Sequence, residues 1–125
     1  MSEVFNYINS SRLRAACEQG SVFATGVYVT NQCSGNPIDI TGYDVLMQVR
    51  LTPESTDVVL EISTGNGYAV VSGAEGKISI YVPSDITADL VPGMYVYDLD
   101  IIDLSSNSQR LIEGQFEITA EVSRA

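Results

Sequence analysis

The sequence contains no histidine and no tryptophan, and it has only two cysteines among its 125 residues. Without histidine, the chain lacks the usual general base that activates a serine or cysteine nucleophile. Two cysteines without histidine do not complete an ordinary zinc site. No GxSxG elbow, Walker loop or dinucleotide fingerprint occurs. These absences predict a protein that is not an enzyme and that needs no cofactor.

Basic residues are also scarce, because six Lys and Arg stand against 16 Asp and Glu, a formal charge of −10. Such a surface repels the phosphates of nucleic acids and the headgroups of anionic membranes. No apolar run approaches the ~20 residues that span a bilayer. The first ten residues, MSEVFNYINS, lack the basic and apolar regions of a secretory signal. We therefore expect neither nucleic acid nor membrane as a partner, and synthesis in a cytoplasm.

The two cysteines, Cys17 and Cys33, lie 16 positions apart. In a cytoplasmic protein, cysteines are most often free thiols that pack as small apolar groups. A disulfide between them requires adjacent strands, and the sequence leaves that question open.

Most of the chain alternates apolar and polar residues with a period of two, which is the pattern of half-buried β-strands. Turn residues (Gly, Pro, Asn and Ser) separate the alternating segments at intervals of about ten residues. This spacing is typical of an antiparallel sandwich or barrel of seven to eight strands, with residues 1–10 as an arm and 11–125 as one domain. The predicted strands are 12–19, 21–30, 43–52, 57–64, 68–73, 77–83, 91–102 and 110–122.

Several local features refine this prediction. The segment SDITADL departs from alternation, so we expect one helical turn that Ser84 caps. Gly114 is expected to mark a β-bulge in the last strand, and GNG at 65–67 a hairpin turn. Tyr95 and Tyr97 share a core face, where a tyrosine can form the hydrogen-bonded corner of a sandwich. Other tyrosines are candidate interface anchors, namely Tyr43, Tyr68 and Tyr81.

Asp98, Asp100 and Asp103 form the most conspicuous acidic cluster. Asp98 and Asp100 share the outer face of a strand, about 7 Å apart. A solvated face or a partner contact explains them best, because charge on a strand also discourages edge-to-edge aggregation. Ca²⁺ binding through carboxylate oxygens is the alternative, although the loop lacks the glycine and ligand spacing of an EF-hand.

Several segments, taken in order, resemble a known family. They are QGSVFATGVYV, GNPIDITGYDVLMQVR, VVLEIST, GKISIYVPSDITADLVPGMYVYDLDI and RLIEGQFEITAEVSR. They are similar to the N-terminal domain of the phage baseplate upper protein family, over roughly residues 18–124. The most specific parts are IDITGYDVLMQVR, the helical turn that leads into PGMYVYDL, and the closing EGQFEITAEVSR.

This resemblance implies an immunoglobulin-like β-sandwich that serves as a bacteriophage virion component, made in the host bacterial cytoplasm. It implies a non-enzymatic adaptor or accessory subunit of the tail, baseplate or neck. Its partners would be other phage virion proteins, including further copies of itself in a ring or trimer. A capsid decoration (cement) protein and a carbohydrate- or calcium-binding module on the same fold are the alternatives.

The expected partner interface combines two regions. The first is the apolar arm, through Val4, Phe5, Tyr7 and Ile8, which would dock on a neighbouring subunit. The second is the acidic outer face of the penultimate strand, through Asp98 and Asp100. In a symmetric assembly, one modest contact of this kind acts many times.

Overall fold

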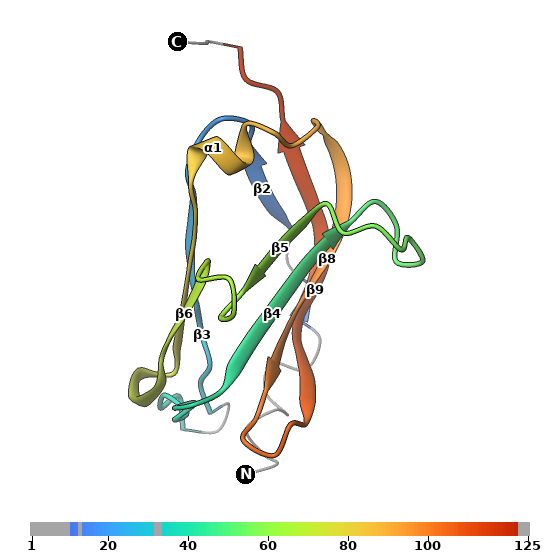
Figure 1. Cartoon of the computed structure of the whole chain (residues 1–125). Helices are drawn as coiled ribbons and strands as arrows, with labels where there is room; N and C mark the ends of the chain where they lie inside the picture. Colours follow the sequence, from blue (N-terminus) through green and yellow to red (C-terminus); the bar gives the residue numbers. More distant parts are fainter. Residues whose placement is uncertain (1–10, 13, 32–33, 123–125) are drawn as a thin grey trace.

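The computed structural model describes residues 11–12, 14–31 and 34–122, and it places them in two facing β-sheets (Figure 1). The larger sheet has the strand order β1-β9-β8-β4-β5, and β2 also pairs with β9. The smaller sheet has the order β3-β7-β6. The strands are β1 (Ser11–Arg12), β2 (Ala15–Glu18), β3 (Phe23–Tyr28), β4 (Asp44–Arg50), β5 (Leu60–Ser63), β6 (Ala69–Ser72), β7 (Lys77–Val82), β8 (Gly93–Ile102) and β9 (Ser108–Thr119).

This order is that of an immunoglobulin-like sandwich, so the predicted fold class is confirmed. The eight predicted strands correspond to β2–β9, and β1 is a two-residue segment at the start of the first one. β1 and β2 pair with β9 in the parallel direction, whereas the other strand pairs are antiparallel. Parallel strands need a long connection, and here the rest of the domain connects the first strands to the last one.

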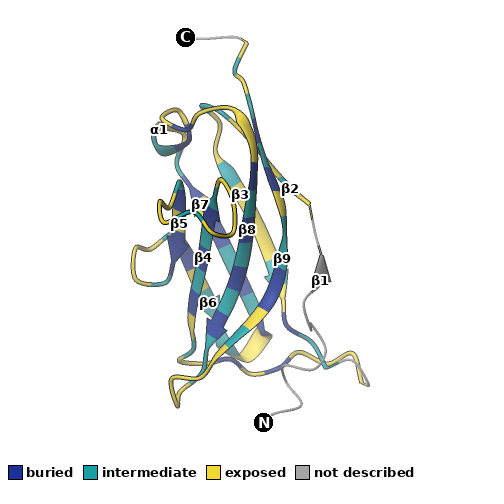
Figure 2. Ribbon diagram, turned by 90° about the vertical axis from the view of Figure 1, so that its right-hand side faces the viewer, coloured by how far each residue is buried: buried dark blue, intermediate teal, exposed yellow. Residues whose placement is uncertain are grey.

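The core lies between the two sheets and follows the predicted alternation, which Figure 2 shows as alternating buried and less buried positions along β4 and β8. The buried row of β7 faces the buried rows of β4, β8 and β9 across this core. The residues in these rows are Val45, Met47, Val49, Ile78, Ile80, Val82, Tyr97, Leu99, Ile101, Ile112, Phe116 and Ile118. Phe116 is at the centre, since the rings of Phe23 and Tyr97 pack edge-on against it at 5.5 and 5.9 Å between centroids. Leu51, which alternation also assigns to the core row, is 61% exposed because β4 ends at Arg50.

The helical turn is α1 (Ser84–Thr87), and it carries the chain from β7 in one sheet to β8 in the other. The predicted cap is wrong, because Pro83 occupies the N-cap and Ser84 is the first helical residue, with no side-chain cap bond. The buried hydroxyl of Thr87 anchors the turn by donating to the carbonyl of Ser21 at 2.7 Å. Thus a threonine bond to another loop replaces the expected cap.

Two further local predictions are wrong. Gly114 pairs regularly with Tyr97, and the bulge lies instead at Leu111, which falls between the partners of Leu99 and Asp100. The segment 65–67 is not a hairpin turn, since β5 and β6 belong to different sheets. Asn66 holds this crossover, accepting from the backbone N–H groups of Ser63 and Tyr68 at 3.0 Å each.

The described helices are α1 and a 3₁₀ turn (Gly73–Glu75) between β6 and β7. Within the described part of the chain, no helix has the length and apolar character needed to cross a lipid bilayer.

Candidate functional site

The candidate site is the outer face of the larger sheet, where polar side chains of β4, β8 and β9 lie side by side. Strand register places Gln48 beside Asp98, and Asp98 beside Glu113. Their neighbours along each strand point into the core, so alternation directs these three side chains outward. Asp98 and Asp100, the two acids predicted as a partner contact, are therefore neighbours on one outer face, with Asp100 beside Arg110.

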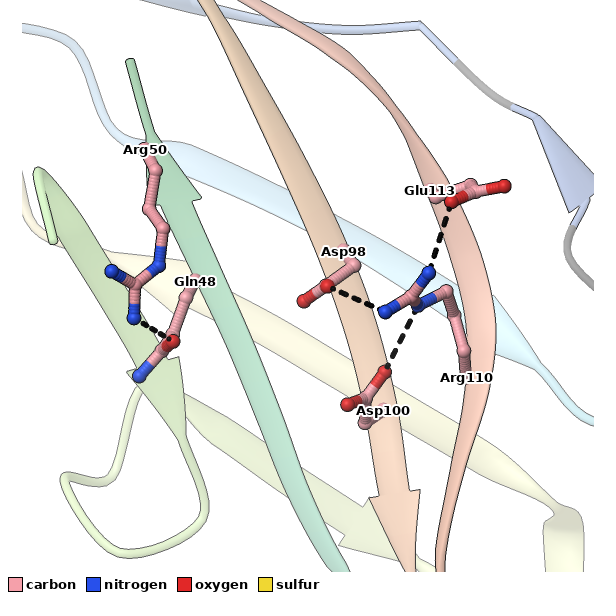
Figure 3. Close-up of polar contacts among 6 residues, drawn as sticks. All are labelled: Gln48, Arg50, Asp98, Asp100, Arg110 and Glu113. Carbon is pink, nitrogen blue, oxygen red and sulfur yellow. Dashed lines mark hydrogen bonds and ion pairs between the residues drawn. The ribbon is translucent and has the colours of Figure 1, made fainter. Parts of the chain in front are cut away.

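Arg110 organises this face (Figure 3). Its guanidinium donates from Nη1 to Oε1 of Glu113 at 3.2 Å, and Nη2 lies 3.3 Å from Oδ2 of Asp98. Nε lies 3.8 Å from Oδ1 of Asp100, an ion pair too long for a hydrogen bond. The bulge at Leu111 sets this arrangement, because it brings Arg110 opposite Asp100. One cation thus holds three carboxylates together.

Asp100 is the most constrained of these acids. Its Oδ1 is buried and has no hydrogen-bond partner within the described part of the chain. Burial raises the pKa of this carboxyl above its ordinary value, the charge of Asp98 raises it further, and Arg110 acts in the opposite direction. The raised pKa means that desolvation and the neighbouring acid together outweigh the distant guanidinium.

A second polar chain continues across β4 to β5. Arg50 donates from Nη2 to Oε1 of Gln48 at 2.8 Å and from Nη1 to the carbonyl of Ser55 at 2.6 Å. Gln48 in turn donates to Oε1 of Glu61 at 3.1 Å. A hollow of about 410 Å³ separates Arg50 from the Arg110 cluster, with Gly114 in its lining. The face therefore presents alternating charges around a shallow depression, which suits a polar protein contact.

Asp103, the third acid of the predicted cluster, does not join the other two. It lies in the loop between β8 and β9, where Oδ1 accepts from the backbone N–H groups of Ser105 and Asn107 at 2.9 Å each. The bond from Asn107 is the main cause of a pKa below the ordinary value of this carboxyl. Across the described residues, no group of three Asp, Glu, Cys or His side chains is arranged to hold a metal ion.

Tyr95 forms the predicted corner. Its hydroxyl donates to the carbonyl of Val91 at 2.7 Å, and the side chain is 8% exposed. Among the tyrosines predicted as interface anchors, Tyr81 is 55% exposed on the outer face of the smaller sheet. Tyr43 and Tyr68 pack partly buried against the core.

The remaining predicted residues divide between the core and the part of the chain outside the described residues. Cys17 is a buried free thiol, and burial raises its pKa above the ordinary value. A buried thiol with a raised pKa packs as a small apolar group. Cys33 and the arm residues Val4, Phe5, Tyr7 and Ile8 lie outside the described residues.

Sequence reasoning missed a groove of about 600 Å³ between β2 and β3, where the two sheets approach without closing. Its walls are the facing edges of β2 and β3, and buried core side chains such as Met47, Leu99 and Ile112 reach its floor. The signal was present in the segment FATGV, because Thr25 and Gly26 interrupt an otherwise apolar strand.

Comparison with known proteins finds no family model and no curated protein that matches. The solved structures that are similar in fold include the following three. CopC from Methylosinus trichosporium OB3b is 9% identical, with a TM-score of 0.44 over 93% of this chain and 89% of that one. The N-terminal domain of phage TP901-1 ORF48 is 15% identical, with a TM-score of 0.43 over 90% and 85%.

The Listeria monocytogenes internalin-like protein lmo2027 is 16% identical, with a TM-score of 0.41 over 90% of this chain and 28% of that one. The three names describe proteins of different kinds, and a shared sandwich does not imply a shared function. At these identities and scores, none of their functions passes to this chain.

Proposed function

We propose that this chain is a non-enzymatic structural component of a bacteriophage virion, an adaptor or accessory subunit of the tail, baseplate or neck. The observation that carries the proposal is the ordered resemblance of its segments to the N-terminal domain of the phage baseplate upper protein family. The chain would be made in the host bacterial cytoplasm and would act in the virion through protein contacts.

The positions of these segments support the proposal. The three most specific ones contribute β4, β8 and β9, which are neighbours in the larger sheet. Together they carry Gln48, Arg50, Asp98 and Glu113, four of the polar residues on the outer face. The resemblance therefore covers the strands that would present this face to a neighbouring subunit.

The electrostatics of the face also fit a reversible protein contact. Arg110 partly neutralises the three acids around it, so a partner would not have to compensate an isolated buried charge. The formal charge of −10 opposes non-specific aggregation of free subunits before assembly. We propose other virion proteins as partners, and neither nucleic acid nor membrane.

Localisation tests this proposal. Particles of the phage that encodes the chain would be purified and labelled with gold-conjugated antibody against the recombinant protein. Label at the tail, baseplate or neck is the expected result. Label over the capsid shell would favour the decoration role instead, and a protein absent from washed particles would overturn the proposal.

A contact-face variant adds a second readout. Asp98→Lys introduces a positive charge beside Arg110 on the exposed face, and we expect it to reduce incorporation of the protein into particles at least tenfold. Glu75→Lys makes the same change of charge on an exposed residue in the turn between β6 and β7 of the smaller sheet, and it serves as the matched control. Equal incorporation of both variants would reject this face as the contact while leaving the virion assignment to the labelling experiment.

A further inference from the structure

The side chains of β3 that point toward the core are not buried, whereas the core-facing side chains of its partner strand β7 are buried. Ile78, Ile80 and Val82 of β7 are 0, 3 and 0% exposed. In the same register, their partners in β3 are Val27, Thr25 and Phe23, and Thr25 is exposed while the other two are half-buried. Figure 2 shows this difference between the two strands. The sandwich is therefore open along one side of β3.

The opening is flanked by two strand edges. Within the described part of the chain, β3 pairs only with β7, and β2 pairs only with β9. The facing edges of β2 and β3 therefore border the groove of about 600 Å³ described above. An edge strand beside an apolar groove is the arrangement in which an added strand supplies main-chain hydrogen bonds and fills pockets with alternate side chains.

We propose that this groove binds residues 4–8 of a second copy of the chain as an added β-strand. The pattern of this segment matches that of β3. Val4, Asn6 and Ile8 repeat the apolar–polar–apolar order of the inward residues Phe23, Thr25 and Val27.

Antiparallel pairing is the more stable arrangement, and in this direction Asn6 would lie opposite Thr25. The outward residues of the two strands are complementary in the same register. Phe5 would lie beside Gly26 and Tyr7 beside Ala24, so that aromatic rings cover the two smallest residues of the edge strand.

Charge also permits the contact, because Glu3 is the only charged side chain in residues 1–10. An almost neutral segment can approach the acidic body of another copy with little repulsion.

Reach excludes the arm of the same chain in this register. In this register Ile8 would pair with Phe23. The rings of Phe23 and Phe116 are in contact, so Ile8 would lie at about the same height along β9 as Phe116. Ser11 pairs with Ile112, four residues or about 13 Å earlier along β9. Three residues from Ile8 to Ser11 extend at most about 11 Å, before any lateral distance is added. A second copy has no such restriction.

This inference deepens the proposed function by naming a partner and its contact, and it concerns the purified protein alone. Reciprocal exchange between two copies gives a closed dimer, whereas head-to-tail exchange gives a ring. Failure of self-association would leave the virion assignment untouched, because that assignment is tested on particles.

Disulfide trapping tests the contact. In a background with Cys17→Ala and Cys33→Ser, the double variant Asn6→Cys/Thr25→Cys should form disulfide-linked dimers or larger species under mild oxidation. The control Tyr7→Cys/Thr25→Cys moves the thiol to the opposite face of the added strand and should link at least fivefold less. Circular dichroism and a cooperative unfolding transition establish that both variants are folded.

Sedimentation velocity of the unmodified chain gives an independent readout. The full chain should self-associate with rising concentration, and a chain that lacks residues 2–9 should stay monomeric. Dimers or rings that depend on these residues support the proposal. A disulfide that forms between the two introduced thiols of a single chain, equal linking by the control, or a full chain that remains monomeric up to millimolar concentration would overturn it.

Discussion

Single hydroxyls and carboxyls fix positions that alternation alone leaves open. The hydroxyl of Tyr95 ties the start of β8 to the carbonyl of Val91, and the hydroxyl of Thr87 ties α1 to the carbonyl of Ser21. Both bonds are partly buried, and a protein hydrogen bond typically contributes about 0.5–1.5 kcal/mol to stability. Asp100 is the opposite case, since its buried Oδ1 lacks such a bond.

Tyr95→Phe should lower the free energy of unfolding by about 1 kcal/mol, because it removes the hydrogen bond that the Tyr95 hydroxyl donates to the carbonyl of Val91. Urea denaturation at pH 7 measures the change. Tyr81→Phe alters a tyrosine that is 55% exposed, and its effect should stay within about 0.5 kcal/mol. Equal effects of the two substitutions would contradict a structural role for the corner.

Asp100→Asn should stabilise the protein at pH 7 by up to about 1 kcal/mol, the usual scale of surface charge effects. Burial raises the folded-state pKa of Asp100 above its ordinary value of 3.8. The contribution of the Asp100 carboxyl to stability is therefore fully present below its unfolded-state pKa, and it is lost as pH rises through its folded-state pKa. The neutral amide of asparagine does not undergo this loss.

The gain from Asp100→Asn should accordingly be larger at pH 7 than at pH 3.5. Urea unfolding of both proteins at the two pH values measures it, with the exposed Asp57→Asn as the control. A gain that grows as pH falls would mean that Arg110 stabilises the charged carboxyl more than burial and Asp98 oppose it.

At the scale of elements, irregular backbone decides which residues face the core. The bulge at Leu111 lets two consecutive residues of β9, Leu111 and Ile112, be buried at 0 and 7% exposure. A strict alternation would place Leu111 on the outer face. The turn from β6 to β7 depends similarly on Gly76, whose φ of +63° is left-handed.

Leu111→Ala should cost about 2–5 kcal/mol, the usual loss when a large apolar side chain is removed from a core. The exposed Gln115→Ala in the same strand is the control and should be nearly neutral. Thermal unfolding compares the two. A neutral Leu111→Ala would show that this residue faces solvent and that the bulge lies elsewhere.

Gly76→Ala should destabilise the protein more than Gly67→Ala does, by at least about 1 kcal/mol. Both glycines have left-handed φ values, +63° and +84°, so both substitutions carry the same strain of about 1–2 kcal/mol. A Cβ at Gly76 would lie 2.6 Å from the carbonyl oxygen of Val29, whereas a Cβ at Gly67 has no neighbour within 4 Å. Urea denaturation of the pair separates the clash from the strain, and equal losses would exclude the clash.

At the scale of the whole molecule, the two sheets close around Phe116 but stay open between β2 and β3. The polar face and the open groove lie on different parts of the surface, since one is the outer face of β4, β8 and β9 and the other lies between the sheets. The two proposed contacts, one of the groove with a second copy and one of the face with another protein, therefore do not compete for the same surface. This separation is consistent with the role proposed for a repeated subunit.

Millimolar Ca²⁺ should leave the melting temperature unchanged. A ligand that binds only the native state raises it by mass action, but Arg110 already lies among Asp98, Asp100 and Glu113. The oxygen Oδ1 of Asp103 is likewise engaged by two backbone N–H groups. Differential scanning fluorimetry with and without Ca²⁺ measures the shift. A rise that disappears in Asp100→Asn would establish the calcium-binding alternative.

Much of the fold was predictable from the sequence, because alternation is a local property. A strand with one face in a core must place apolar residues at every second position, so alternation by itself assigns Val45, Met47 and Val49 inward, where they are buried. The corner of Tyr95 and the helical turn at Ser84–Thr87 were predictable for the same reason, since each depends on residues a few positions apart.

The sequence by itself determined the strands, their buried faces and the excess of acid on the surface. Only the tertiary structure decided the bulge at Leu111, the ring of acids around Arg110, and the opening beside Thr25. These features depend on which strands are neighbours and in what register, and residues far apart in the chain set that pairing. Local alternation specifies which face of a strand is apolar. The contacts between strands specify which charged side chains become neighbours and where the sandwich stays open.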